Sequence, residues 1–169
     1  MRYCCRWALV LLLSACASMH SATPLRIGPF AAFEGRLIAV TPSQRWQASL
    51  HWRAPSPEHG ALRLLHAASG FVLEAEWDKP RLRLRDSRYP VWREVTVEAL
   101  RRHGLLLPPW TIAALLQGRL PHGFHRVRGD VWQGRIDDAL VRMDWRAKQR
   151  RLELTDITHG RRLVVLIEP

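Results

Sequence analysis

Apolar residues recur at every second position through much of this chain, and this alternation favours a fold built from strands. Between Arg45 and Trp52, tryptophan, alanine and leucine alternate with glutamine, serine and histidine, and the same period returns between Phe71 and Trp77. Successive side chains of a strand point to opposite faces, so each segment has one apolar and one polar face. The pattern predicts an antiparallel sheet with one face buried and the other in water.

Two helical segments interrupt the expected strands. The strands are expected at 35–40, 45–52, 61–66, 71–77, 81–85, 123–127, 131–135, 140–145, 152–155 and 162–167. Thr96 can cap a helix that stops at Gly104, and Pro108-Pro109 can open another that stops at Gly118. The second helix is apolar nearly all round and must be covered on several sides. We therefore expect a mostly β fold with some α: a curved sheet under a helical lid.

The N-terminus has the features of a bacterial export signal. Arg2 and Arg6 precede the apolar run Ala8–Leu13, which is far shorter than the about 20 residues of a membrane-spanning helix. The tetrapeptide Leu13-Ser14-Ala15-Cys16 resembles the lipobox of bacterial lipoproteins. The resemblance implies cleavage before Cys16, a diacylglyceryl group on its thiol and an acyl group on its amine. The alternative is an ordinary signal with a chance cysteine.

The expected organisation is a signal peptide at 1–15, a lipidated N-terminus and tether at 16–32, and one domain at 33–169. Residues 17–30 are rich in serine, proline and glycine and lack a clear period. Cys4 and Cys5 fall in the signal, so a lipidated Cys16 leaves no cysteine for a disulfide. Stability must then come from the core, and a chain of this size suits one domain.

The basic charge points to an anionic partner. Without the two arginines of the signal, 24 basic residues stand against 15 acidic ones, a formal charge of +9. Export argues against nucleic acid and favours an anionic lipid surface. Arg81, Arg83 and Arg85 share one side of an expected strand and are candidates for contact with the membrane or with a carrier protein. The alternative is a solvated arginine-rich face.

The sequence lacks the motifs of common enzymes. It has no Gly-x-Ser-x-Gly, phosphate-binding glycine loop or His-Glu-x-x-His. His122 and His125 have a possible metal spacing but no third ligand nearby. Adjacent Asp137 and Asp138 would point to opposite faces of a strand or serve the backbone of a turn. We expect no enzymatic activity, no catalytic residue and no metal.

Tryptophans on the apolar faces suggest a cavity. Of eight tryptophans, only Trp7 lies in the signal. Large and small residues that alternate inside a curved sheet can line a site for an apolar ligand, although they can also fill a solid core. The expected lining residues are Trp46, Leu50, Trp52, Phe71, Leu73, Trp77, Trp110, Ile112 and Leu116.

A series of short motifs resembles the LolB family of outer-membrane lipoprotein receptors and the wider LolA/LolB fold group. The motifs are Gly35-Arg36-Leu37, the segment 46–52, Gly104 to Pro108, Leu115-Leu116 with Gly118, Leu120-Pro121 and Leu152 to Asp156. The resemblance implies an incomplete antiparallel β-barrel closed by helices around a hydrophobic cavity. It further implies a monomer on the periplasmic face of the outer membrane, without a cofactor, that accepts lipoproteins from a LolA-type carrier and places them in that membrane.

Two positions bear on this resemblance. Ala17 stands where the family's inner-membrane retention signal has aspartate, which fits sorting to the outer membrane. Ala67-Ala68-Ser69-Gly70 stands where LolB proteins carry a loop leucine offered to the membrane. Two alternatives therefore stay open: a divergent LolB-like protein for an envelope glycolipid or another lipid-tailed product, and a structural envelope lipoprotein without a ligand.

The lipobox gives a direct prediction. Cys16→Ser removes the thiol that would carry lipid, so we expect uncleaved precursor or a product without the diacylglyceryl mass. Intact-mass measurement of membrane fractions checks this. Normal processing and anchoring of the variant would refute the lipoprotein assignment.

Overall fold

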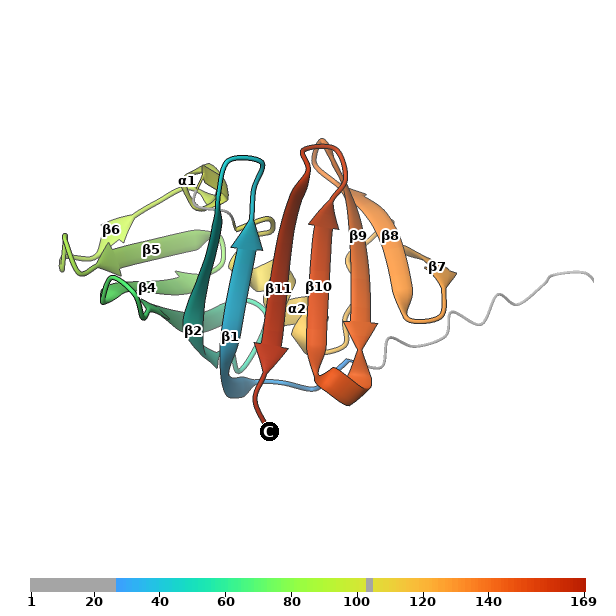
Figure 1. The fold of residues 1–169 in the computed structure, drawn as a ribbon, viewed down its shortest axis with the longest axis horizontal. Coiled ribbons are helices and arrows are strands. Elements are labelled where there is room, and N and C mark those ends of the chain that lie inside the picture. Colours follow the sequence, from blue (N-terminus) through green and yellow to red (C-terminus); the bar gives the residue numbers. More distant parts are fainter. Residues whose placement is uncertain (1–26, 103–104) are drawn as a thin grey trace, which may run out of the picture.

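The strands form one curved antiparallel sheet (Figure 1). The computed structural model describes residues 27–102 and 105–169. Cys16 and the predicted signal therefore lie outside the described residues. The sheet order is β6-β5-β4-β3-β2-β1-β11-β10-β9-β8-β7. The strands are β1 Ala32–Val40, β2 Arg45–Arg53, β3 His59–His66, β4 Phe71–Asp78, β5 Arg81–Asp86, β6 Arg93–Glu94, β7 His125–Arg128, β8 Val131–Ile136, β9 Ala139–Arg146, β10 Arg151–Asp156 and β11 Arg161–Ile167. Pairing of β1 with β11 joins the two halves of the sheet (Figure 1).

The alternation in the sequence sets which side chains face inward, as predicted. In β2, Ala48, Leu50 and Trp52 are buried while the residues between them are exposed. The predicted strands are confirmed with small shifts at their ends. Strand β6 was not predicted, because two residues are too few to show a period.

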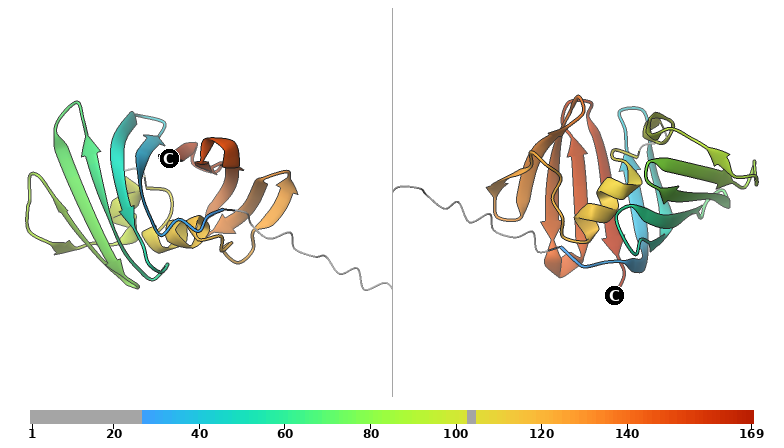
Figure 2. Two further views of the ribbon diagram at one scale, coloured as in Figure 1. Left: turned by 90° about the horizontal axis from the view of Figure 1, so that it is seen from below. Right: turned by 180° about the vertical axis from the view of Figure 1, so that it is seen from behind.

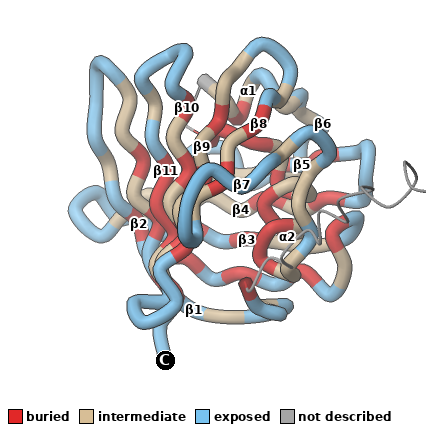
Figure 3. The backbone as a smooth tube through the Cα atoms, turned by 90° about the vertical axis from the view of Figure 1, so that its right-hand side faces the viewer, coloured by how far each residue is buried: buried red, intermediate tan, exposed pale blue. Residues whose placement is uncertain are grey.

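Two α-helices lie between β6 and β7. Helix α1, Val97–Arg102, follows Thr96, whose Oγ1 accepts a hydrogen bond from the backbone N–H of Ala99 at 3.3 Å. Helix α2, Pro109–Leu116, crosses the inner face of the sheet, as Figure 2 shows from behind. Most of α2 is buried, and buried residues also follow the central strands (Figure 3).

The segment before β1 ties α2 to the sheet. The backbone N–H of Phe30 donates to the carbonyl of Leu116 at 3.0 Å, and Gln117 Nε2 donates to the carbonyl of Ala54 at 2.8 Å. Ile27 is buried in the same core. Part of the predicted tether at 16–32 therefore packs against the domain.

Aromatic rings fill part of the core. The ring centroids of Trp52 and Trp77 lie 5.2 Å apart, and Phe33 stacks on Trp52 at 6.1 Å. Trp77 Nε1 donates to the carbonyl of Pro57 at 3.0 Å. A Cβ added at Gly60 would lie 2.3 Å from the Trp77 ring, so glycine there makes room for the tryptophan.

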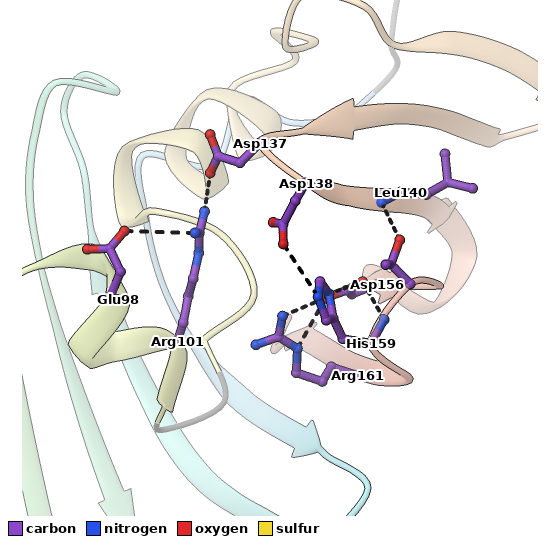
Figure 4. Close-up of polar contacts among 9 residues, drawn as sticks. Glu98, Arg101, Asp137, Asp138, Leu140, Asp156, His159 and Arg161 are labelled. Atoms are coloured by element: carbon purple, nitrogen blue, oxygen red, sulfur yellow. Dashed lines mark hydrogen bonds and ion pairs between the residues drawn. The ribbon is translucent and has the colours of Figure 1, made fainter.

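A buried carboxylate organises the turn between β10 and β11 (Figure 4). Asp156 is 2% exposed and accepts hydrogen bonds from the backbone N–H of His159 at 3.0 Å and from Arg161 Nη2 at 2.8 Å. His159 Nε2 lies 3.5 Å from Asp138 in the turn between β8 and β9. The neighbouring Asp137 pairs with Arg101 of α1. These contacts link α1 and two turns of the far half of the sheet.

The pKa of Asp156 is set by opposing effects. Burial alone would raise it, but the hydrogen bonds from the His159 backbone and ring and from the Arg161 guanidinium outweigh burial and hold the pKa below its ordinary value. A carboxyl with a lowered folded-state pKa stabilises the fold above its unfolded pKa of about 3.9. That contribution is lost as the pH falls through the folded-state pKa.

Asp156→Asn should therefore lower the free energy of unfolding at pH 7 by about 3 kcal/mol, because it leaves Arg161 without its buried partner. The difference from the unmodified protein should shrink as the pH falls below about 4. Urea unfolding at several pH values measures both effects. Asp138→Asn is the control: its side chain is 78% exposed, so we expect a loss of at most about 1 kcal/mol. Equal losses in the two variants would contradict this account.

Candidate functional site

Two adjoining apolar hollows open on the inner side of the sheet. The first has a volume of about 380 Å³ and is lined by Trp46, Ala48, Leu64, Phe71 and Leu73, with Gln44, His66, Ser69 and Arg88 at its polar edge. The second, of about 330 Å³, is lined by Phe71, Leu73, Leu84, Val95, Ala99 and Leu100, with Asp86, Arg93 and Glu94 at its edge. Since both hollows include Phe71 and Leu73, they form one candidate site.

The hollows occur where the inner face lies beyond α2. No residue of α2 lines either hollow, whereas Ala99 and Leu100 of α1 line the second. Phe71 and Leu73 are accordingly half-buried, although Ala75 and Trp77 on the same face of β4 are buried. Ala48 adds space because its small side chain lies between Trp46 and Leu50 on the inner face of β2.

The edge of the site is polar and partly cationic. The guanidinium of Arg88 lies 5.8 Å from the centroid of the Phe71 ring, and no carboxylate among the described residues pairs with it. Arg93 Nη2 lies 3.3 Å from Asp86. His66 Nδ1 and Ser69 Oγ are 2.8 Å apart. The first hollow, with an apolar floor and Arg88 at its edge, therefore suits a ligand that has an apolar tail and an anionic head, whereas the edge of the second hollow also carries Asp86 and Glu94.

The structure separates the predicted lining residues into two groups. Trp46, Phe71 and Leu73 line the hollows. The residues that pack inside the core are Leu50, Trp52, Trp77, Ile112 and Leu116. Trp110 of α2 is half-buried and lines neither hollow. The inner face is thus a solid core over much of its area and hollow only where α2 does not reach.

Several lining residues were not predicted. Leu64 continues the alternation of β3, and Ala48 lies between two predicted residues, so the period alone could have included both. Arg88 and Arg93 flank a loop without a period, and their place beside the site depends on the return of the chain from β5 to β6. The periodicity of the sequence therefore could not predict that these two arginines lie beside the site.

The predicted arginine row points to the outer face but is largely compensated. Arg83 Nη2 lies 2.9 Å from Glu76, and Arg85 pairs with Glu74. Both guanidinium groups also lie over the Trp92 ring, at 5.8 and 4.6 Å from its centroid. Arg81 is exposed and forms no ion pair within the described part of the chain. The row therefore offers less free positive charge than its sequence suggests, and its role in membrane or carrier contact stays a prediction.

Other sequence candidates show no reactive arrangement. His122 is exposed in the segment before β7 and His125 is exposed within β7. Over residues 27–102 and 105–169, no three His, Cys, Asp or Glu side chains are placed to hold a metal ion. Asp137 lies in a turn with φ 54°, where it and Asp138 pair with Arg101 and His159. Of the helices in these ranges, none combines the length and apolar character needed to cross a bilayer.

Comparison of the sequence with protein-family models finds no match. Comparison with curated proteins also finds no match.

Leucine-to-tryptophan substitutions should distinguish hollow from core. Leu73→Trp adds volume beside open space and should lower the free energy of unfolding by less than about 1 kcal/mol, whereas Leu50→Trp overpacks a filled core and should cost about 1 to 3 kcal/mol. Urea unfolding measures both values. Leu73→Trp should also abolish binding of an apolar fluorescent probe. Equal stability losses together with unchanged probe binding would rule out the hollows as a ligand site.

Proposed function

We propose that this chain is a lipid-anchored protein of the outer membrane, facing the periplasm, that holds acyl chains in the adjoining hollows. In this proposal it accepts lipoproteins from a soluble LolA-type carrier and places them in the outer membrane. The observation that carries the proposal is the pair of apolar hollows that share Phe71 and Leu73 on an otherwise packed inner face. The lipobox at Cys16 supplies the anchor, and the curved antiparallel sheet is compatible with a LolB-like barrel.

The energetics of acyl chains explain why such a site is useful. Each methylene moved from water into an apolar site contributes about 0.8 kcal/mol. Chains of ordinary length therefore leave a membrane or a carrier for water very slowly. A protein site of similar apolarity gives a route that avoids water, and no nucleotide is needed if transfer follows differences in affinity. The hollows, of about 380 and 330 Å³, fall at the lower end of the usual ligand-site range of about 300 to 1,000 Å³.

In this mechanism the two helices have different roles. Helix α2 is fixed, because Phe30 and Gln117 hydrogen-bond it to the rest of the domain. Helix α1 is short, covers the second hollow with Ala99 and Leu100, and is held to the far half of the sheet through Arg101 and Asp137. We assign the lid function to α1, whose displacement would join the hollows into a wider opening. Lid motions of this type occur in microseconds to milliseconds.

The size and edge of the hollows favour a second candidate from the same fold group. Small hollows edged by Arg88 and His66 suit a lipid with few chains and an anionic head, as expected for an envelope glycolipid or another lipid-tailed product. The exposed turn 67–70, which has no leucine, also differs from the family's membrane-inserting loop. A structural envelope lipoprotein would need no ligand at all. These alternatives differ in what the protein carries.

Native mass spectrometry of protein extracted from its own membrane tests the proposal. We expect a bound acylated species in the unmodified protein and none in Leu73→Trp. An acylated peptide should also displace an apolar probe from the unmodified protein. A bound lipoprotein supports the receptor function, whereas a bound glycolipid supports the second candidate. Absence of bound lipid together with no displacement would leave only the structural lipoprotein.

A further inference from the structure

The loop between β5 and β6 presents apolar side chains to solvent. Val91 is 71% exposed and Tyr89 is 60% exposed, the highest values among the large apolar residues of the described chain. Pro90 lies between them, and we call Tyr89, Pro90 and Val91 the apolar tip. The loop projects beyond the edge of the sheet, at the left in Figure 1. Single exposed apolar residues are ordinary, whereas here three lie together on one projecting loop, which makes the loop a candidate contact surface.

Hydrogen bonds hold the apolar tip in this conformation. The Asp86 carboxylate accepts from the backbone N–H groups of Arg88 and Tyr89, each at 2.8 Å. The backbone N–H of Asp86 donates to the Tyr89 carbonyl at 3.2 Å. The guanidinium of Arg93 lies 4.9 Å from the centroid of the Tyr89 ring and also hydrogen-bonds Asp86. The tip is therefore ordered with its apolar side chains outward, which lowers the entropy cost of using them in a contact.

Cationic side chains flank the apolar tip. Arg88 precedes it and pairs with no carboxylate among the described residues, whereas Arg93, which follows Trp92, pairs with Asp86. Without the two arginines of the expected signal, the chain carries a formal charge of +9. Aromatic residues favour the boundary between lipid headgroups and acyl chains, and arginine binds phosphate. Apolar side chains at the outermost point with arginines behind them match the layers of an anionic bilayer, where charge lies outside and apolar material within.

The apolar tip also lies beside the adjoining hollows. Arg88 is at the edge of the first hollow, and Asp86 and Arg93 are at the edge of the second. A surface that contacts the tip would therefore meet the hollows near their polar edge. This juxtaposition connects a contact surface to a site that can hold apolar chains.

We propose that the apolar tip inserts into the headgroup region of an anionic bilayer, with Arg88 binding lipid phosphate, and that it brings the hollows to the membrane. The inference deepens the proposed function and rests on it only for the use of the hollows. Insertion of the tip is measured independently of any cargo.

Labelling one exposed valine at each edge of the sheet tests insertion. Val91→Cys and, as the control, Val127→Cys are made in the processed, lipidated protein, in which the introduced cysteine is the one free thiol. Each purified variant is labelled with an environment-sensitive fluorophore and then added to vesicles of phosphatidylglycerol and phosphatidylethanolamine. Val127 is a matched control because it is 53% exposed and lies between Arg126 and Arg128 in β7. We expect a blue-shifted emission that lipid-borne quenchers reduce at position 91 and not at position 127.

Charge variants test the role of the arginine. Arg88→Gln should lower the insertion equilibrium about fivefold, and the effect should fall with salt, whereas Arg128→Gln should leave it unchanged. Equal solvation of positions 91 and 127 on anionic vesicles would overturn the proposal. So would a shift at position 91 that appears only when an acidic carrier protein is added, because the tip would then be a protein contact.

A double variant separates this inference from the proposed function. Tyr89→Ser with Val91→Ser should lose membrane insertion but retain binding of an apolar probe in the hollows, since neither side chain lines them. If the unmodified protein binds the probe but does not insert into vesicles, the insertion proposal is refuted and the proposed function is not. If the unmodified protein inserts into vesicles but binds no probe, the proposed function is refuted and the insertion proposal is not.

Discussion

Helix α2 packs against the inner face of the sheet, and this packing forms the centre of the hydrophobic core. An antiparallel sheet with one apolar face must bury that face, either by curving around a helix or by packing against a second layer. Here α2 lies on that face with Ile112, Leu115 and Leu116 fully buried. The segment around Phe30 and the side chain of Gln117 fix it there through hydrogen bonds. The curvature of the sheet and the place of the core both follow from this packing.

The same packing explains why the candidate site lies off centre. A helix of the length of Pro109–Leu116 is about 12 Å long, too short to cover every strand of the sheet. The inner faces of β2 to β5 beyond it are covered only in part by α1. Apolar side chains such as Phe71 and Leu73 therefore line hollows instead of filling a core. In the proposed function, the site exists because the core is incomplete at this point.

Charge on the outer face is organised differently from charge at the β5–β6 loop. Along the strands, opposite charges lie side by side across neighbouring strands, as Arg83 and Glu76 do. Such exposed pairs contribute little to stability and leave little net field. In the loop, Arg88 has no partner among the described residues and lies beside exposed apolar side chains. Unpaired positive charge thus lies next to exposed apolar side chains in the loop, whereas in the predicted row only Arg81 is unpaired and no exposed large apolar side chain belongs to β5.

Local sequence signals were enough to predict every strand except β6, both helices and the inward faces, because the alternation of Trp46 to Trp52 and the helix starts at Thr96 and Pro108 do not depend on distant contacts. It could not separate Leu73, which lines a hollow, from Leu50, which is buried, since both follow the same period. That difference depends on where α2 ends over the sheet. The ion pairs of Arg83 and Arg85 and the place of Arg88 likewise depend on strand register and loop geometry. These features follow from the folded chain, because they arise from contacts between residues that lie far apart in the sequence or across the strands of the sheet.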